Sequence, residues 1–229
     1  GQDLGVVDEV IAQAVSKDCG SRLLLAILKS CPSRNRLVFL SCRIMAALMA
    51  FEPNAAVVAR LDGGITTIVN IVHPRKETRS FEAAAIEAGF VEDVERTPEA
   101  IEAALDLLAC FTVDNESNVA ALSKIGGFSK LSAGITDAMA FPGILRAAFN
   151  VFFSCTKTDK FSAIVGRTTP AIAFALTVLN KYSSPRYVAL TVCVLNVLAQ
   201  LSASSSNMAV LFSNKGADTV MVTMKAPGV

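Results

Sequence analysis

The sequence predicts an all-α protein in which similar helical units are stacked side by side as a solenoid. The first observation is a phrase that recurs: an apolar stretch, a turn marked by glycine, then a second apolar stretch. Its clearest copies cover residues 54–72, 118–135 and 207–224. The second observation is that each long apolar segment has the period of an α-helix, and none alternates as a strand with hairpin turns would.

Each copy of the phrase carries residues that begin and end helices. The three copies open with asparagine, at Asn54, Asn118 and Asn207. An asparagine side-chain oxygen can cap the start of a helix. The turns are marked by Gly64, Gly127 and Gly216. Because glycine readily adopts the left-handed conformation that ends a helix, each copy predicts a capped short helix, a glycine stop and a second helix.

The first helices are separated by prolines. Apolar residues at helical spacing predict helices over 6–15 and 21–28, a looser copy of the phrase. Pro32 separates them from a longer helix over 33–51. Its predicted core face consists of Leu37, Leu40, Ile44 and Leu48. Pro53 follows this helix and ends it, because a residue before proline avoids the α conformation.

Residues 75–96 differ from the rest of the chain. They follow the copy that ends at His73, are rich in alanine and charged residues, and contain little core material. We interpret them as an inserted, solvent-facing helix and loop, or else as a join between two separate stretches of sequence. Pro98 then starts a long helix over 101–113, since proline is favoured in a first helical turn. Its predicted core face is Ile101, Leu105, Leu108 and Phe111.

The second half of the chain continues the same order of helices. Each long helix follows a proline: Pro142 before 144–155, Pro170 before 171–179 and Pro185 before 187–201. The segment 160–169 matches the first part of the phrase, with Thr168 and Thr169 in place of glycines. The copy at 207–224 comes last.

The spacing of the turns gives the strongest argument for repeats. The turn residues are Gly20, Gly64, Gly127, Thr169 and Gly216, which are 44, 63, 42 and 47 residues apart. Three steps fall near the ~40–47 residues of helical repeat arrays, and removing the 22 residues of the insertion reduces the outlier to 41. The predicted units are roughly 1–52, 53–113 with the insertion 75–96, 114–156, 157–203 and an incomplete 204–229.

The unit has an asparagine, a glycine pair, a middle helix and a long helix in that order. This order resembles the armadillo repeat. The resemblance implies a right-handed solenoid of three-helix units, whose third helices line a concave groove that binds extended peptides or partner helices. In that family an asparagine on the third helix often clamps the backbone of the ligand. Asn150 and Asn196 match that position, whereas Arg146 and Val192 stand where the family has an aromatic residue one turn earlier.

Two hypotheses remain open for these asparagines. In the middle of an apolar helix, asparagine is unfavourable unless it has a hydrogen-bonding partner. The partner is either a neighbouring helix of the stack or a ligand in the groove. Arg146 and Gln200 lie one turn away and would extend a polar stripe. Arg36 and Arg43 either extend it at the other end or are simply solvated, so the predicted groove comprises Asn150, Asn196, Arg146, Gln200, Arg43 and Arg36.

No residue pattern points to catalysis, a cofactor or a metal. His73 is the only histidine and lies beside Pro74 at a predicted helix end, where a surface role is expected. The carboxylates Glu92, Asp93 and Glu95 are expected on a solvated face. The glycine pairs lack the lysine and flanking strand of a phosphate-binding loop. We therefore expect a protein that is not an enzyme and holds no cofactor or metal.

The composition of the chain limits the classes of partner that we expect. The chain has 21 basic and 20 acidic residues, so no strong field would attract nucleic acid or an anionic membrane. Its longest apolar run, 187–201, contains two polar amides and is shorter than the ~20 residues of a membrane span. The start of the chain lacks a signal peptide and an initiating methionine, so upstream sequence is expected to be absent.

The six cysteines are Cys19, Cys31, Cys42, Cys110, Cys155 and Cys193. They form no CxxC pair, and each lies in or beside an apolar stretch. This pattern predicts reduced, buried thiols in a cytoplasmic, reducing compartment.

The last predicted unit lacks a third helix and offers little polar surface, since Val220, Val222 and Met224 alternate with Met221 and Thr223. We expect this end to be covered by a protein partner, a second copy or further sequence. The predicted function is a non-catalytic scaffold or adaptor that holds a protein segment in its groove. The alternative is a structural subunit of a large assembly, held through its apolar ends with an empty groove.

Overall fold

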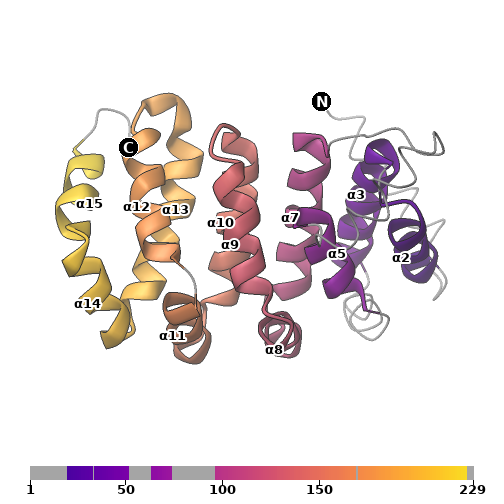
Figure 1. Cartoon of the computed structure of the whole chain (residues 1–229), viewed down its shortest axis with the longest axis horizontal. Coiled ribbons are helices and arrows are strands. Elements are labelled where there is room, and N and C mark those ends of the chain that lie inside the picture. The colour runs from indigo at the N-terminus through magenta and orange to yellow at the C-terminus, as the bar shows by residue number, and fades with distance from the viewer. Residues whose placement is uncertain (1–19, 33, 52–62, 74–95, 169, 226–229) are drawn as a thin grey trace, which may run out of the picture. The chain divides into compact units, whose positions relative to one another are not determined.

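A computed structural model describes residues 20–32, 34–51, 63–73, 96–168 and 170–225. Within these ranges the protein is all-α, with twelve α-helices, one short 3-10 helix and no strand (Figure 1). The expectation of an all-helical chain is therefore confirmed. The predictions for Asn54, for a helix over 6–15 and for the insertion 75–96 lie outside the described residues.

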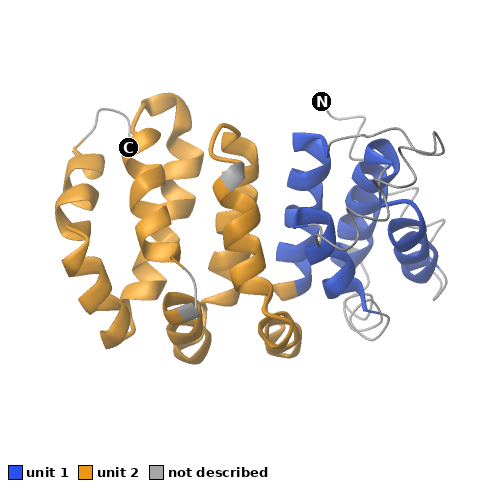
Figure 2. Cartoon of the chain, in the orientation of Figure 1, with its two compact units in different colours: residues 1–111 blue, residues 112–229 orange. Residues whose placement is uncertain are grey.

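The chain divides into two compact units, residues 1–111 and 112–229 (Figure 2). Unit 1 contains α2 (Gly20–Ser30), α3 (Asn35–Phe51), α5 (Gly64–Val72) and most of α7 (Pro98–Thr112). Helix α2 packs against both α3 and α5. The core of unit 1 is made of aliphatic, aromatic and sulfur-containing side chains.

The predicted core face of α3 is wrong for most of its residues. Leu37 and Leu40 are each 43% exposed, whereas Val38 and Cys42 are fully buried. The predicted residues and the buried ones both have helical spacing. Because α3 is apolar around most of its circumference, the helical period alone could not show which face is buried. The face predicted for α7 fits better, since Leu105, Leu108 and Phe111 are all fully buried.

Unit 2 repeats an order of short, middle and long helices. Its elements are α8 (Glu116–Lys124), α9 (Gly127–Asp137), α10 (Pro142–Cys155), α11 (Asp159–Thr168), α12 (Ala171–Lys181), a 3-10 turn (Pro185–Tyr187), α13 (Val188–Ser202), α14 (Ser205–Ser213) and α15 (Gly216–Met224). Helix α13 packs along α10, α15 packs on α12, and α14 contacts α11 and α13.

Turns form at the predicted places, but the prediction that Gly64, Gly127 and Gly216 are the left-handed residues is wrong. Gly64, Gly127 and Gly216 are each the first residue of a helix. The residue before each is left-handed, with φ of 77° at Gly63, 66° at Gly126 and 54° at Lys215. The helix-starting glycines are needed for space. A Cβ on Gly127 would lie 2.8 Å from the Leu122 carbonyl oxygen, and one on Gly216 equally close to that of Leu211.

The prediction that Asn118 and Asn207 cap helices is wrong. Both are buried inside helices, and Asn115 caps α8 instead by accepting a hydrogen bond from the Asn118 backbone N–H at 3.1 Å. The Asn207 Nδ2 donates to the carbonyl oxygens of Ser162 at 3.1 Å and Leu201 at 3.0 Å. A side chain at Gly166 would overlap this amide. Asn207 therefore ties α14 to backbone outside its own helix.

Several side-chain hydrogen bonds in unit 2 join residues 42 to 45 positions apart. Helix ends are joined by Thr112 with Ser154 at 2.6 Å and by Thr156, which donates to Gln200 Oε1 at 2.5 Å. The Tyr182 hydroxyl donates to the Met139 carbonyl at 2.7 Å. Each of these bonds links one element to an element about one predicted repeat length later in the sequence. The bonds therefore hold consecutive groups of helices in unit 2 at a fixed offset.

We expect Lys215→Gly to stabilise the protein. A non-glycine residue in the left-handed conformation costs roughly 1–2 kcal/mol, and the flexibility of glycine in the unfolded chain offsets part of the gain. The free energy of unfolding, measured by urea denaturation, should rise by about 1 kcal/mol. Lys225→Gly is the matched control, because Lys225 is exposed and right-handed. A Lys215→Gly protein no more stable than the control would contradict this explanation of the turn.

Candidate functional site

The six predicted groove residues lie on three helices. Arg36 and Arg43 are exposed on α3 in unit 1. In unit 2, α10 carries Arg146 and Asn150, and α13 carries Asn196 and Gln200. Because α10 and α13 pack along each other, the four residues of unit 2 share one region of the molecule.

Asn150 has a partner within the stack. It is half-buried, and its Oδ1 accepts a hydrogen bond from the Cys193 Sγ of α13 at 3.2 Å. Burial raises the pKa of the Cys193 thiol, and the positive charge of Arg146 partly opposes that rise. The Cys193 thiol thus lies near both polar residues of α10, and it gives Asn150 the intramolecular partner that one of the two hypotheses required.

Gln200 also has a structural role. Its side-chain oxygen accepts from the Thr156 hydroxyl just after α10, and its backbone carbonyl accepts from the Ser162 hydroxyl of α11 at 3.0 Å. These two bonds fix the turn between α10 and α11 against the end of α13. The sequence prediction placed Gln200 in a groove and missed both partners.

Asn196 differs from the other three residues. Its side chain is exposed and forms no hydrogen bond with any residue that the structure describes. Val192, one turn earlier on α13, is 46% exposed. Of the predicted asparagines, Asn196 is therefore the one whose amide is available to a ligand.

A cavity of about 250 Å³ lies where α8 begins, between the end of α10 and the start of α11. Asp114 and Lys157 form an ion pair of 2.6 Å at its edge, and both are exposed, so the pair contributes at most about 1 kcal/mol. Thr112 and Ser154 are hydrogen-bonded to each other at its wall. Burial raises the pKa of Cys155, also in the wall, to about 12, so this thiol is not an activated nucleophile.

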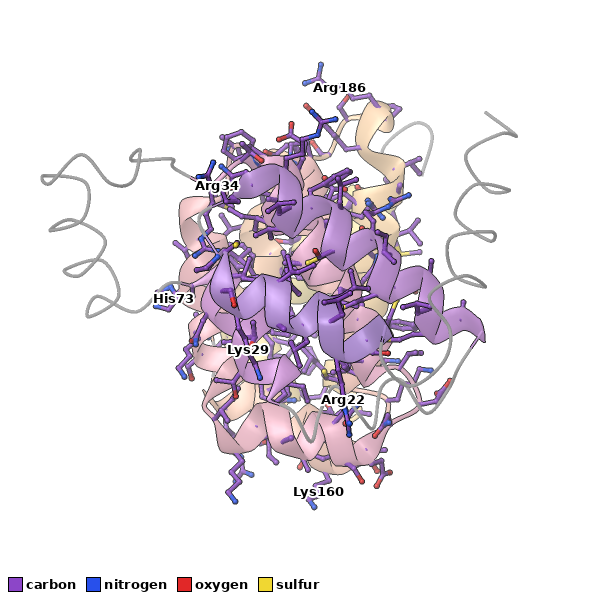
Figure 3. All side chains as sticks on the ribbon, turned by 90° about the vertical axis from the view of Figure 1, so that its right-hand side faces the viewer. Arg22, Lys29, Arg34, His73, Lys160 and Arg186 are labelled. Atoms are coloured by element: carbon purple, nitrogen blue, oxygen red, sulfur yellow. The ribbon has the colours of Figure 1, made fainter. Side chains whose placement is uncertain are left out.

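Figure 3 shows Arg22, Lys29 and Arg34 at separate places on the described part of unit 1, and His73 lies just after the end of α5. In the described part of the chain, no group of three His, Cys, Asp or Glu residues could hold a metal ion.

Five cysteines fall within the described residues, and all five are free thiols. Cys42 and Cys155 are buried, as predicted, whereas Cys31, Cys110 and Cys193 are partly exposed. Cys19 lies outside the described residues.

Among the described residues, the segment Pro185–Ser202 is long and apolar enough to cross a membrane, and the bent pair Asp159–Arg167 and Ala171–Lys181 would be a second candidate if it formed one span. A single segment of this kind is weak evidence for a span, because the core helix of a soluble protein has the same length and composition. Helix α13, which forms most of this segment, packs along α10 and buries Val194, Val197 and Leu198.

Comparisons with protein-family models, curated proteins and solved structures give no match. The resemblance to armadillo repeats consequently remains a prediction.

Sequence reasoning missed the partners Cys193 and Thr156, whereas it expected the apolar surface of α15, to which the structure adds Phe212 of α14. Phe212, Met221, Val222 and Met224 are 63, 54, 70 and 61% exposed. The missed partners had a detectable signal, since each lies 43 or 44 residues from the residue it contacts, which is the predicted repeat length.

We expect Asn150→Ala and Asn196→Ala to differ in stability. Both remove an asparagine from a helix interior and gain the same helix propensity, so each is the control for the other. Only Asn150→Ala loses an interhelical hydrogen bond, and its free energy of unfolding should be lower than that of Asn196→Ala by about 1 kcal/mol. Equal stabilities in urea denaturation would show that the Cys193 bond contributes nothing.

Thiol alkylation should distinguish the cysteines. Burial raises the pKa of Cys42 and of Cys155 to about 12, so at pH 8 their reactive thiolate fraction is roughly a thousandth of that of an ordinary thiol. Iodoacetamide should label the partly exposed Cys31 first, as followed by mass spectrometry. Labelling of Cys42 or Cys155 in the folded chain as fast as in urea would refute the burial argument.

The same pKa shifts predict how stability changes with pH. Between about pH 9 and 12 the unfolded chain loses thiol protons that the folded chain retains. The contribution of these thiols to stability is therefore complete below about pH 9 and is lost as the pH rises toward 12.

Proposed function

We propose that this protein is a non-catalytic scaffold or adaptor for protein–protein interaction, built as a right-handed solenoid of armadillo-type three-helix units. Its partner is a protein segment that lies along the third helices, with Arg146 and Asn196 as the contacting residues on α10 and α13. No cofactor, metal or nucleic acid takes part in this function.

The solenoid is supported by hydrogen bonds that recur at one separation. In unit 2 they join residues 42 to 45 positions apart, such as Asn150 with Cys193 and Ser162 with Asn207. Helix α13 packs on α10 and α15 packs on α12, so a long helix meets a long helix and a middle helix meets a middle helix. Elements that contact their counterparts in the next unit are the mark of a stacked repeat array.

Exposure of Asn196 is the observation that carries the binding proposal. An exposed carboxamide in the middle of a helix offers a donor and an acceptor, which is what the backbone of an extended segment requires. Asn196 lies on the long helix of its unit, which in a solenoid contributes to an extended binding face. With a formal net charge of +1, the chain has no strong field to select a highly charged partner.

A cytoplasmic, reducing compartment is part of the proposal. The free thiols of the described residues support it, because cysteines of secreted proteins are generally paired.

The alternative function is that of a structural subunit held through apolar ends. Its supporting observation is the exposed apolar surface of α14 and α15, on which Val222 is 70% exposed. Single exposed apolar residues are ordinary, but several on adjacent helices are typical of surfaces that contact another protein.

Selection of peptides from a displayed library on the full chain tests the proposed function. We expect enriched segments to bind in solution and the double substitution Arg146→Ala, Asn196→Ala to weaken them at least about ten-fold, because both contacts are lost. Asn180→Ala is the matched control, since Asn180 is exposed on α12.

Peptides that bind the double variant as tightly as the unchanged chain would refute binding at these residues. If no peptide is enriched and Val222→Glu abolishes self-association of the chain, the structural-subunit alternative is favoured instead. Circular dichroism of each variant separates loss of binding from loss of folding.

A further inference from the structure

Helices α10 and α13 can be compared position by position, because Asn150 and Asn196 occupy matching places in them. Residues 144–155 then align with residues 190–201. At half of the twelve aligned positions both helices are buried. These pairs are Ile144 and Leu190, Leu145 and Thr191, Ala148 and Val194, Val151 and Val197, Phe152 and Leu198, and Cys155 and Leu201.

At each of the remaining aligned positions α13 is more exposed than α10. These pairs are Arg146 and Val192, Ala147 and Cys193, Phe149 and Leu195, Asn150 and Asn196, Phe153 and Ala199, and Ser154 and Gln200. Their spacing along the helix is i, i+1, i+3, i+4, i+7 and i+8, which places them on one face. Two of these α13 residues already have partners, because Cys193 bonds to Asn150 and Gln200 bonds to Thr156 and Ser162. The other four, Val192, Leu195, Asn196 and Ala199, have the spacing i, i+3, i+4 and i+7, and we call them the outer face of α13.

On α10 the matching face is covered by α13 and α12. The Cys193 thiol of α13 donates to Asn150 there, and the Phe149 ring stacks on Phe174 of α12 with the ring centroids 5.8 Å apart. Helices α11, α12 and α14 also pack on α13. Within the described part of the chain they nevertheless leave Val192, Asn196 and Ala199 exposed, and Asn196 has no partner there.

We propose that the outer face of α13 binds an α-helix of a partner protein in the way that α13 binds α10. This deepens the proposed function, on which it rests, by naming the partner as a helix and the site as the face centred on Asn196. The site continues the α10–α13 interface by one further layer.

The chemistry of the face defines its partner. From Val192 to Gln200 the helix has no charged residue, and the exposed Val192 and Ala199 are apolar. A basic or acidic segment would lose hydration without gaining an ion pair. The partner helix is therefore apolar on its docking side.

One polar contact sets the register of that helix. Asn150 accepts from a thiol three positions before the residue that matches it on the next helix. By the same geometry, Asn196 accepts from a small thiol or hydroxyl side chain of the partner. The small residue Ala199 allows the two helix axes to approach closely, as helix packing requires.

Binding of a helical peptide to the full chain tests this proposal. The probe is a fluorescein-labelled peptide of residues 186–203, with Cys193→Ser and three added lysines at one end, because α13 is the helix that covers the matching face. We expect saturable binding by fluorescence anisotropy, at least about ten-fold weaker for Asn196→Lys, which places a charge in the apolar contact. Ala199→Lys should weaken it equally, and Asn180→Lys is the matched control.

Several results would overturn the proposal. Equal binding of a scrambled peptide, or of the Asn196→Lys and Ala199→Lys variants that retain their circular dichroism, would show that the contact is unspecific. A dimer of the unchanged chain in sedimentation equilibrium that is lost on Asn196→Lys would assign the face to a second copy. Cosedimentation with phosphatidylcholine vesicles that is lost in the same variant would assign it to lipid.

The test also separates this proposal from the function on which it rests. If the helical peptide fails to bind while library-selected extended peptides still require Arg146 and Asn196, the helix-docking proposal is wrong and the scaffold function stands.

Discussion

The packing of α13 along α10 is the contact on which unit 2 depends. Both helices bury aliphatic or aromatic side chains, such as Phe152 and Val194, and their ends lie so that Thr156 meets Gln200. Apolar burial supplies the stabilisation, but it is not directional and would tolerate a slip of one turn. The hydrogen bonds of Asn150 and Gln200 oppose such a slip, because a buried polar group left without its partner costs about 1–3 kcal/mol.

Buried asparagines have the same purpose elsewhere in unit 2. Asn207 lies inside α14 and donates to the backbone carbonyls of Ser162 in α11 and Leu201 in α13. It fits only because Gly166 leaves room for the amide. Asn207 on α14 and Gly166 on α11 thus fix how α14 packs on α11. Such polar contacts favour one arrangement of an interior that is otherwise uniformly apolar.

This dual use of asparagine explains why a binding surface was hard to recognise. Asn150 and Asn196 both lie before a valine in an apolar helix, yet the first is bonded to Cys193 of α13 and the second is exposed. A residue type that joins α10 to α13 is chemically able to join a partner where it is exposed. The proposed site therefore offers on α13 the kind of contact that α10 makes within unit 2.

The sequence alone determined the helices, their order and their turns, because helical period, proline and glycine act over a few residues. It also predicted a spacing close to the separation of 42 to 44 residues across which Thr112, Asn150 and Thr156 form hydrogen bonds. The tertiary structure decided which face of α3 is buried, why Asn118 and Asn207 are not caps, and which asparagine is exposed. These outcomes depend on which helices, distant in the sequence, pack against each side chain. The same type of side chain is buried where another helix packs on it and exposed where none does.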